Sequence, residues 1–462
     1  MDHLKQTMRL VGAATVAVAA VAFAASALAA VSAEEASQLG GPVLTQFGAE
    51  RAGNKDGTIP AYTGTGVKAP PTWDPKNPGQ RPDPYGEKPL FTITAQNAAQ
   101  YADKLDGMIE MFKRYPNFRM DIYPSHRDWV FPQYVLDNTI KNATACKAVN
   151  KELKLEGCYG GLPFPIPKTG NQAMWNHLAG YQSWSADGRS EYWLVPISGD
   201  AVMVGRSTFL NNWPYYDPDV KGPHPADLIY YRYLGKDEAP ARAVGAQFLL
   251  HESLDQMGVG RKVYQYQPAR RWVKITANLA YDTPNPYTGG SATMDDGGIF
   301  SGALDRYDFE LAGKKEKFIY ANSFMFNDEK ACANTVITAT RNFPNPDCVR
   351  WELHRVWVVK AKLKPGFRHL YHTRVFYWDE DGFVGAQSEN YDANGKIYRI
   401  VSSPVIPFFE APGGFGTVVF MDLQSGIWAA GSIMSCTNCG WWPILDRIPE
   451  NTFSPGAMSG AR

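Results

Sequence analysis

Alternating apolar and polar positions dominate the second half of the chain and predict β-strands. From about Glu191 onward, segments rich in Tyr, Val, Ile and Trp are separated by Pro, Gly and Asp, which is typical of strands and turns. Four of these segments read EYWLVPI, DLIYYRYL, GAQFLLHESLD and RKVYQYQPARRWVKIT. The pattern therefore predicts an antiparallel β region over residues 191–435.

The clearest strand pattern lies in residues 352–401. Apolar residues occupy every second position, and the polar residues between them, including Glu352 and His354, are expected on the solvent side. Turn sequences KPGF, DEDG and DANG separate the strands, because Pro presets the first central residue of a turn and Gly tolerates a positive φ. The region predicts a four-stranded antiparallel meander.

An antiparallel sheet of this size twists, and it can curl into a half-barrel whose concave face is covered by helices. At least one helix is predicted, from a cap at Thr94 to about Arg114, because apolar side chains recur there every three or four residues. The predicted fold class is α+β, mainly antiparallel β: a large curved half-barrel sheet covered by helices, with an extended Pro-rich N-terminal segment.

Local composition divides the chain into five segments. The first is a secretory signal peptide, since Lys5 and Arg9 precede an apolar run that ends in the small-residue triplet Ala27-Leu28-Ala29. The alternative is a retained membrane anchor, because the run is long enough to span a bilayer. The divisions are 1–29, signal peptide; 30–93, extended Pro/Gly-rich segment; 94–190, helical and irregular elaboration; 191–435, antiparallel β half-barrel; and 436–462, C-terminal tail.

Six cysteines suit an exported protein in an oxidising compartment. Proximity in the sequence favours two local disulfides, each closing a short loop, but it does not fix the pairing. The third pair forms a C-x-x-C motif that leaves a local disulfide, a redox pair or half of a zinc site open. In order, the three pairs are Cys146 and Cys158, Cys332 and Cys348, and Cys436 and Cys439.

Charge and composition exclude some classes of protein. With 46 Lys+Arg against 46 Asp+Glu, the chain lacks the excess of cations that a nucleic-acid binder needs. With 13 Trp, 24 Tyr and 23 Phe it has ample apolar side chains for a core, so it is not a disordered chain.

The search for catalytic motifs gives no positive argument for an enzyme. His251-Glu252 begins like a zinc-protease helix, but the second histidine is missing and the surrounding run predicts a strand. His354, His369 and His372 lie on neighbouring predicted strands, where they would either converge on a metal or acid–base site or occupy the solvent face. No catalytic residue, cofactor-binding residue, metal ligand or cofactor is assigned.

Several segments resemble a proteobacterial family of exported proteins of unknown function, related to the outer-membrane lipoprotein-sorting proteins of the LolA/LolB type. They are GAERAGNKDGTIPAYTG (48–64), PNFRMDIYPSHR (116–127), GLPFPIPKTGNQAMWNH (161–177), RRWVKITANLAYDTP (270–284), FSGALDRYDFELAGKKE (300–316) and WELHRVWVVKAKLKPGFRHLYHTRVFYWDEDGF (351–383). The resemblance implies an incomplete barrel with an apolar cavity, and an RND-superfamily transporter and an outer-membrane protein as partners. The signal peptide predicts a periplasmic location, and because the first cysteine is Cys146, far from the cleavage site, the protein is not expected to be a lipoprotein.

Together these features predict a periplasmic carrier or binding protein for a lipid or another hydrophobic compound. The alternatives are a non-catalytic adaptor or assembly factor of an envelope transporter, and a hydrolase-like enzyme acting on a hydrophobic substrate. Because side chains of a strand alternate between its faces, about half of the aromatic residues on the predicted strands are expected to line the cavity. The candidates are Trp193, Tyr230, Tyr264, Tyr266, Trp272, Trp357, Tyr371 and Tyr377.

Overall fold

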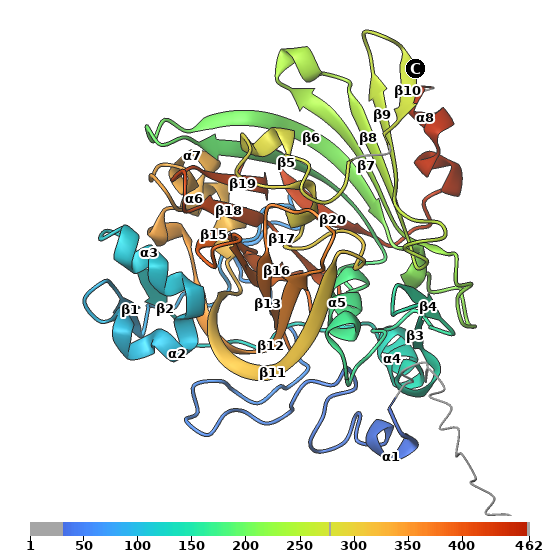
Figure 1. The fold of residues 1–462 in the computed structure, drawn as a ribbon. Helices are drawn as coiled ribbons and strands as arrows, with labels where there is room; N and C mark the ends of the chain where they lie inside the picture. Colours follow the sequence, from blue (N-terminus) through green and yellow to red (C-terminus); the bar gives the residue numbers. More distant parts are fainter. Residues whose placement is uncertain (1–30, 277–278, 460–462) are drawn as a thin grey trace, which may run out of the picture.

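One continuous sheet organises the chain in a computed structural model, which describes residues 31–276 and 279–459 (Figure 1). The predicted signal peptide, residues 1–29, lies outside the described residues. The sheet has 16 strands, in the order β1-β2-β12-β13-β14-β15-β18-β19-β5-β6-β7-β8-β9-β10, with β11 beside β12 and β20 beside β5. All pairs are antiparallel except the single parallel bridge between β2 and β12. The two edge strands of the sheet, β1 and β10, do not pair with each other, so the sheet is an open, curved half-barrel, as the sequence predicts.

The strands of this sheet are β1 (Phe91–Ile93), β2 (Met120–Ile122), β5 (Ser185–Val195), β6 (Val202–Asn212), β7 (Ile229–Ala239), β8 (Gln247–Ser253), β9 (Lys262–Gln267), β10 (Trp272–Ile275), β11 (Tyr307–Tyr320), β12 (Trp351–Leu363), β13 (Thr373–Asp379), β14 (Ala386–Tyr391), β15 (Ile397–Ser402), β18 (Val418–Asp422), β19 (Trp428–Ile433) and β20 (Gly440–Ile444). Two small ribbons pair β3 (Lys147–Val149) with β4 (Lys154–Glu156) and β16 (Val405–Pro407) with β17 (Gly414–Gly416).

The α-helices are short, and they lie around the sheet rather than forming a layer of their own (Figure 1). They are α1 (Ala33–Ala36), α2 (Ala102–Leu105), α3 (Ile109–Arg114), α4 (Gln133–Ala145), α5 (Gly170–Leu178), α6 (Glu329–Cys332), α7 (Asn334–Ile337) and α8 (Pro455–Ser459). Of these, α5 packs on β11 and β12, and its first turn is capped by Thr169, whose hydroxyl accepts from the Gln172 amide.

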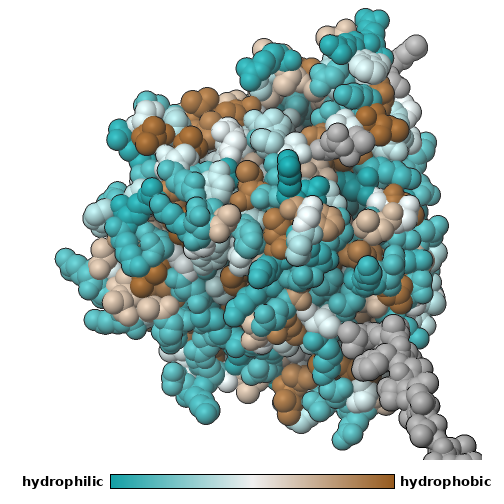
Figure 2. All heavy atoms as spheres, in the orientation of Figure 1, coloured by the Kyte–Doolittle hydropathy of each residue, from teal (hydrophilic) through white to brown (hydrophobic). Residues whose placement is uncertain are grey.

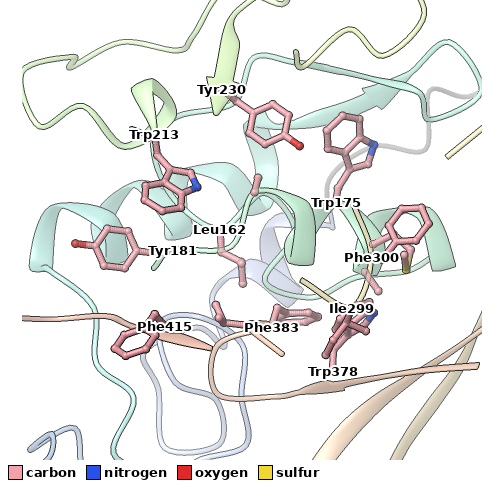
Figure 3. Packing of buried hydrophobic residues seen from close by; sticks show 14 of the residues in the cluster. Leu162, Trp175, Tyr181, Trp213, Tyr230, Ile299, Phe300, Trp378, Phe383 and Phe415 are labelled. Atoms are coloured by element: carbon pink, nitrogen blue, oxygen red, sulfur yellow. The ribbon is translucent and has the colours of Figure 1, made fainter. Parts of the chain in front are cut away.

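The middle strands are buried on both faces, which explains their nearly continuous apolar sequence. In β18, Val418 and Phe420 belong to one core, whereas Val419 and Met421 belong to another on the opposite face. The first core contains α5 and many aromatic side chains, as Figure 3 shows. The second core packs the helical segment from residue 98 to residue 114 and the segment from residue 318 to residue 349 against the other face.

The predicted meander is confirmed, because β12, β13, β14 and β15 pair consecutively and antiparallel. The prediction that Glu352 and His354 face solvent is wrong, because both side chains are buried. Residues 120–128 cross that face of β12, and the His126 amide donates to Glu352 Oε2 (2.8 Å). The chain thereby shields these polar groups from water and supplies hydrogen bonds in place of water.

The predicted helix from Thr94 to Arg114 is interrupted. It consists of α2 and α3 with 3₁₀ turns at Ala98–Tyr101 and Asp106–Met108, and Asp106 has φ of 50°. That conformation is outside the helical region, and the Asp106 carboxylate binds Lys315 (2.7 Å). An ion pair with the sheet therefore accompanies the break in the helix.

Three disulfides connect the cysteines as neighbours in the sequence: Cys146–Cys158, Cys332–Cys348 and Cys436–Cys439. In the C-x-x-C motif the disulfide closes a tight turn just before β20. No helix in residues 31–276 or 279–459 combines the length and the apolar character that a membrane crossing requires.

Trp428 tests the role of the second core. Its side chain is fully buried in β19, and its indole N–H donates to the Thr340 carbonyl (3.0 Å). We expect Trp428→Ala to lower the free energy of unfolding by about 3–5 kcal/mol, because it leaves a cavity and an unpaired carbonyl. Urea denaturation with the disulfides intact measures this. Leu445→Ala, at an 80% exposed position, is the control and should change it by less than about 0.5 kcal/mol; equal effects of both variants would contradict the account.

Candidate ligand-binding cavity

A cavity of about 400 Å³ lies against one face of strands β5 to β9. This face is called the inner face here. The opposite wall consists of the end of α5, at His177 and Leu178, and of residues from 279–301, which we call the cover segment. The cover segment contains two 3₁₀ turns, Pro286–Thr288 and Met294–Asp296.

Strand alternation and small side chains create this space. On β8, Phe248, Leu250 and Glu252 point to the inner face, as expected for every second residue. On β6, Ser207 occupies an inner-face position with a small side chain, whereas the space beside Gly235 on β7 is filled by the ring of Tyr233. The cover segment does not fill the remaining space on the inner face, so a gap is left between the cover segment and the sheet.

The lining combines aromatic rings with uncharged polar groups. The aromatic residues are Tyr192, Trp213, Tyr230, Tyr231, Tyr233, Phe248, Tyr287 and Phe300. The rings of Tyr192 and Tyr287 stack with their centroids 4.9 Å apart and thereby join β5 to the cover segment. The amides are Gln182, Gln247, Gln265, Gln267 and Asn285. Such a lining suits a ligand that is largely apolar and carries a few polar groups.

A charged pair lies at the more deeply buried end of the cavity. Arg261 Nε donates to Glu252 Oε1 (2.7 Å), and its Nη2 donates to Ser301 Oγ of the cover segment (2.6 Å). Burial would lower the pKa of Arg261, but Glu252 outweighs this effect and raises it. Both side chains are largely buried, whereas Gln267 at the other end of β9 is exposed.

Buried ion pairs anchor the cover segment to the meander. Arg374 on β13 donates to Asp295 (2.9 Å) and to Asp296 (2.9 Å), and His369 Nε2 lies 3.0 Å from Asp295. Burial would raise the pKa of Asp295, but Arg374 and His369 outweigh it and hold this pKa well below its usual range. Removing Arg374 would leave two buried carboxylates without their cation, so the position of the cover depends on it.

His177 connects α5 with the meander and with the cover segment. Its ring stacks on Trp378 with the centroids 3.8 Å apart, and its two nitrogens each lie 3.0 Å from a backbone carbonyl, those of Phe383 and Phe300. Burial lowers the pKa of His177 to about 4, so the ring is neutral at pH 7. A neutral imidazole has a single N–H, and it therefore donates to one of these carbonyls only.

Among the eight aromatic residues predicted as lining candidates, Tyr230 lies in the cavity wall. Tyr264 and Tyr266 point to the other face of β9 and pack with residues of the C-terminal segment, including Phe453 and Met458. Trp193 packs against the second core, and Trp272 is 45% exposed on β10. The remaining three contact polar groups: Trp357 lies under Lys314, Tyr371 donates to Asp296, and Tyr377 donates to Glu389.

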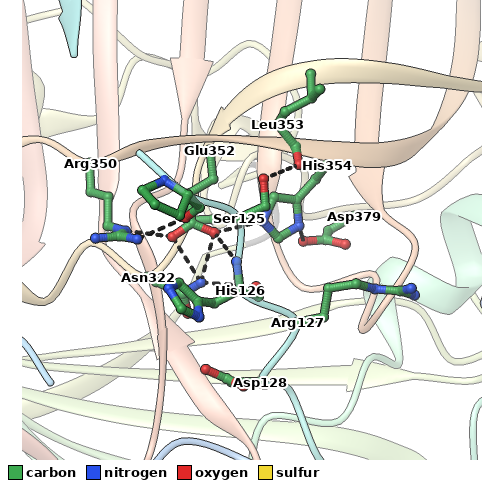
Figure 4. A network of polar contacts seen from close by, with 12 residues as sticks. Ser125, His126, Arg127, Asp128, Asn322, Arg350, Glu352, Leu353, His354 and Asp379 are labelled. Carbon is green, nitrogen blue, oxygen red and sulfur yellow. Dashed lines mark hydrogen bonds and ion pairs between the residues drawn. The ribbon is translucent and has the colours of Figure 1, made fainter. Parts of the chain in front are cut away.

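The three histidines singled out in the sequence bind different partners (Figure 4 shows His354). His354 lies between Glu352 (Nε2–Oε2, 3.0 Å) and Asp379 (Nδ1–Oδ2, 2.9 Å), and His369 binds Asp295 on the cover segment. His372 continues the backbone pairing with Tyr391 through its amide. Of the two alternatives for these histidines, convergence on one site therefore does not occur.

His354, Asp379 and Asp381 are close enough to resemble a metal site, with their ligand atoms within 4.8 Å of one another. Their electrostatics favour ion pairs instead. Burial would lower the pKa of His354, but Asp379 and Glu352 outweigh it and raise it to about 10, so both ring nitrogens carry protons. Asp381 is engaged by Arg127 through two hydrogen bonds, of 2.8 and 2.6 Å. These groups already neutralise one another without an ion.

Sequence reasoning did not find Arg261 and Glu252. In the sequence Glu252 belongs to an incomplete zinc-protease motif, and Arg261 lies in a run of alternating charged and aromatic residues. Their pairing follows from the register of β8 and β9, in which His251 lies opposite Lys262, so that Glu252 faces Arg261 one residue further on. The register of the β8–β9 hairpin is the information needed to recognise them as cross-strand neighbours.

Residues 92–459 match the family described as "Protein of unknown function (DUF1329)". A relative from Pseudomonas aeruginosa, the uncharacterized protein PA3922, is 37% identical over 407 residues, which cover 87% of each chain. The chain therefore belongs to the DUF1329 family, and the family membership expected from its sequence segments is confirmed.

Solved structures give more distant likenesses. A domain classed with the outer membrane lipoprotein-sorting proteins, from Vibrio parahaemolyticus, has a TM-score of 0.40 at 14% identity and covers 62% of this chain and 97% of that one. A DUF1329 family protein from Desulfovibrio piger has a TM-score of 0.37 at 12% identity, over 60% of this chain and 92% of that one. A LolA superfamily protein from Nitrosomonas europaea has a TM-score of 0.34 at 10% identity, over 62% and 98%.

The protonated His354 gives stability a defined pH dependence. A histidine in an unfolded chain has a pKa near 6.5, whereas that of His354 is about 10. The stability from its ion pairs is therefore fully present below about pH 6.5 and is lost as the pH rises to about 10. Between these pH values we expect the free energy of unfolding of the wild-type protein to fall by up to about 1.4 kcal/mol per pH unit more than that of His354→Gln. Urea denaturation at a series of pH values measures this difference, and parallel pH profiles for the two proteins would contradict it.

Proposed function

We propose that this protein binds a hydrophobic compound in the cavity between strands β5 to β9 and the cover segment, and carries it through the periplasm. The observation that carries the proposal is the cavity itself. Its volume of about 400 Å³ falls within the range of about 300–1,000 Å³ that is typical of small-molecule sites. Aromatic rings from three strands and from the cover segment supply an apolar lining.

The energetic need for such a cavity is direct. Exposing an apolar chain to water costs about 0.8 kcal/mol per CH₂, or roughly 8 kcal/mol for ten of them. A compound of this kind partitions into membranes and does not cross an aqueous compartment unaided. A protein that removes the chain from water lowers this cost and makes transfer between two membranes practicable.

The compartment in this proposal is supported by the three disulfides, which are typical of proteins outside the reducing cytoplasm. The signal sequence read from residues 1–29 agrees with export. An RND-superfamily transporter and an outer-membrane protein remain the proposed partners, as the family resemblance implies. Crosslinking in the intact envelope, followed by identification of the attached proteins, would test this partnership.

Binding rather than catalysis is supported by how the titratable lining groups are used. Glu252 is paired with Arg261, and Asp237 accepts a hydrogen bond from Tyr287 (2.8 Å). Within the described part of the chain, no serine of the lining is hydrogen-bonded to a histidine as a nucleophile would be. An adaptor would instead present an extended apolar surface, whereas the face in Figure 2 is mainly hydrophilic with small separate apolar areas.

Filling the cavity tests the proposal. Leu250 is buried on β8 and lines the cavity, so Leu250→Trp places a bulky indole ring in the space proposed for the ligand. We expect the wild-type protein to bind the neutral fluorescent probe N-phenyl-1-naphthylamine with one saturable site, and Leu250→Trp to weaken this binding by at least roughly tenfold, about 1.4 kcal/mol.

The control adds the same bulk elsewhere. Ile275→Trp alters a 65% exposed residue of β10 that is not part of the lining, and it should bind the probe like the wild-type protein. Circular dichroism checks that both variants are folded. A wild-type protein that does not bind the probe, or a folded Leu250→Trp variant with unchanged affinity, would overturn the proposed site.

A further inference from the structure

The polar groups of the cavity are not distributed evenly, and their position bears on the chemistry of the ligand. Burial increases along the strands from one end of the cavity to the other: Gln267 is exposed and Asp237 is half-buried, whereas Tyr230 and Glu252 are buried. Arg261 lies beside Glu252 at this buried end, with 12% of its side chain exposed. A molecule that enters along the strands therefore meets the charged pair last.

The charged pair has two unused hydrogen-bonding atoms. Arg261 uses Nε and Nη2 for Glu252 and Ser301, and Nη1 has no partner among the described residues. Glu252 uses Oε1 for Arg261, and its Oε2 likewise has no hydrogen-bond partner within the described chain. Both residues line the cavity. Within the described structure neither atom is among the fully buried polar atoms that lack a partner, so each keeps some solvent-accessible surface. One donor and one acceptor are thus available in the lining of the cavity.

The net charge of this pair decides which headgroup suits it. Glu252 neutralises Arg261, so an ionised group that entered would lose its hydration without meeting an uncompensated opposite charge, which is costly at a buried site. A hydroxyl both donates and accepts, and it carries no charge. It can accept from Arg261 Nη1 or donate to Glu252 Oε2, and hydrogen bonds to charged groups are stronger than those between neutral ones.

We propose that Arg261 and Glu252 form a headgroup site selective for an uncharged hydroxyl, so that the ligand is an apolar molecule with a hydroxyl at the end that enters first. This inference rests on the proposed function and adds the chemical class of its ligand. The apolar part of the molecule then lies along Tyr231, Tyr233, Phe248 and Leu250, toward the open end of the strands.

Three probes with the same ten-carbon chain and different headgroups test the selectivity: 1-decanol, decyl sulfate and decyltrimethylammonium. Their affinities are measured by displacement of N-phenyl-1-naphthylamine, below the concentrations at which the probes form micelles. We expect the wild-type protein to bind 1-decanol at least roughly tenfold more tightly than either ion, a difference of about 1.4 kcal/mol.

A change of charge at the site should change the ranking. Glu252→Gln keeps a polar side chain but leaves Arg261 without its counter-charge, so decyl sulfate should gain by more than the wild-type difference between the two probes and overtake 1-decanol. A structural role alone would not reverse a preference between headgroups. Arg232→Met is the matched control, because Arg232 is an arginine on the opposite face of β7 that pairs with Glu450, and it should leave the ranking unchanged.

A second variant covers the case in which Glu252→Gln does not fold. The double variant Glu252→Leu with Arg261→Met replaces the pair by apolar residues of similar size, which buried ion pairs often tolerate. We expect it to fold and to lose at least roughly tenfold in affinity for 1-decanol while still binding N-phenyl-1-naphthylamine.

The outcomes separate this inference from the proposed function. If the wild-type protein binds N-phenyl-1-naphthylamine but does not distinguish the three headgroups, or if the double variant retains the wild-type affinity for 1-decanol, the headgroup site is refuted and the cavity stands as an apolar site. If the wild-type protein binds none of the four molecules, the proposed function fails and the headgroup site with it.

Discussion

The structure depends on the burial of a single sheet on both of its faces. Each strand presents side chains alternately to two sides, and a 16-stranded sheet therefore needs two layers of cover. Over the middle strands both layers are complete, as the alternation of Val418, Val419, Phe420 and Met421 between two cores shows. Toward β7, β8 and β9 the inner face is covered by the end of α5 and the cover segment, and the cavity lies between them and the strands.

Buried ion pairs hold the irregular segments in place around this sheet. The cover segment buries Ala292, Ile299 and Phe300 in the first core, and polar contacts with the strands add specificity to this packing. Arg374 binds the two aspartates of the cover segment, and Arg127 binds Asp381 in the turn after β13. Such pairs contribute little net stability compared with apolar packing, but breaking one leaves an unpaired buried charge. They therefore fix one arrangement of the cover over the cavity.

The strand pattern made much of the fold predictable, and the cavity wall much less so. The meander over residues 352–401 follows from local alternation and turn residues alone. The burial of Glu352 and His354 does not, because it depends on residues 120–128, which are distant in the sequence. The assignment of aromatic residues to the inner face also required the strand registers: Tyr264 and Tyr266 lie on the outer face of β9, one position away from the lining residue Gln265. A shift of one residue exchanges the two faces of a strand.

The central claim is that the cavity holds a molecule in the living cell. Native mass spectrometry of the protein, purified without detergent from the periplasm of its host, tests this most directly. The account predicts a mass above that of the processed chain by one small molecule, which is released on denaturation and which lipid extraction recovers as a hydroxylated apolar compound. A bare chain mass that stays unchanged after incubation with 1-decanol would contradict the account.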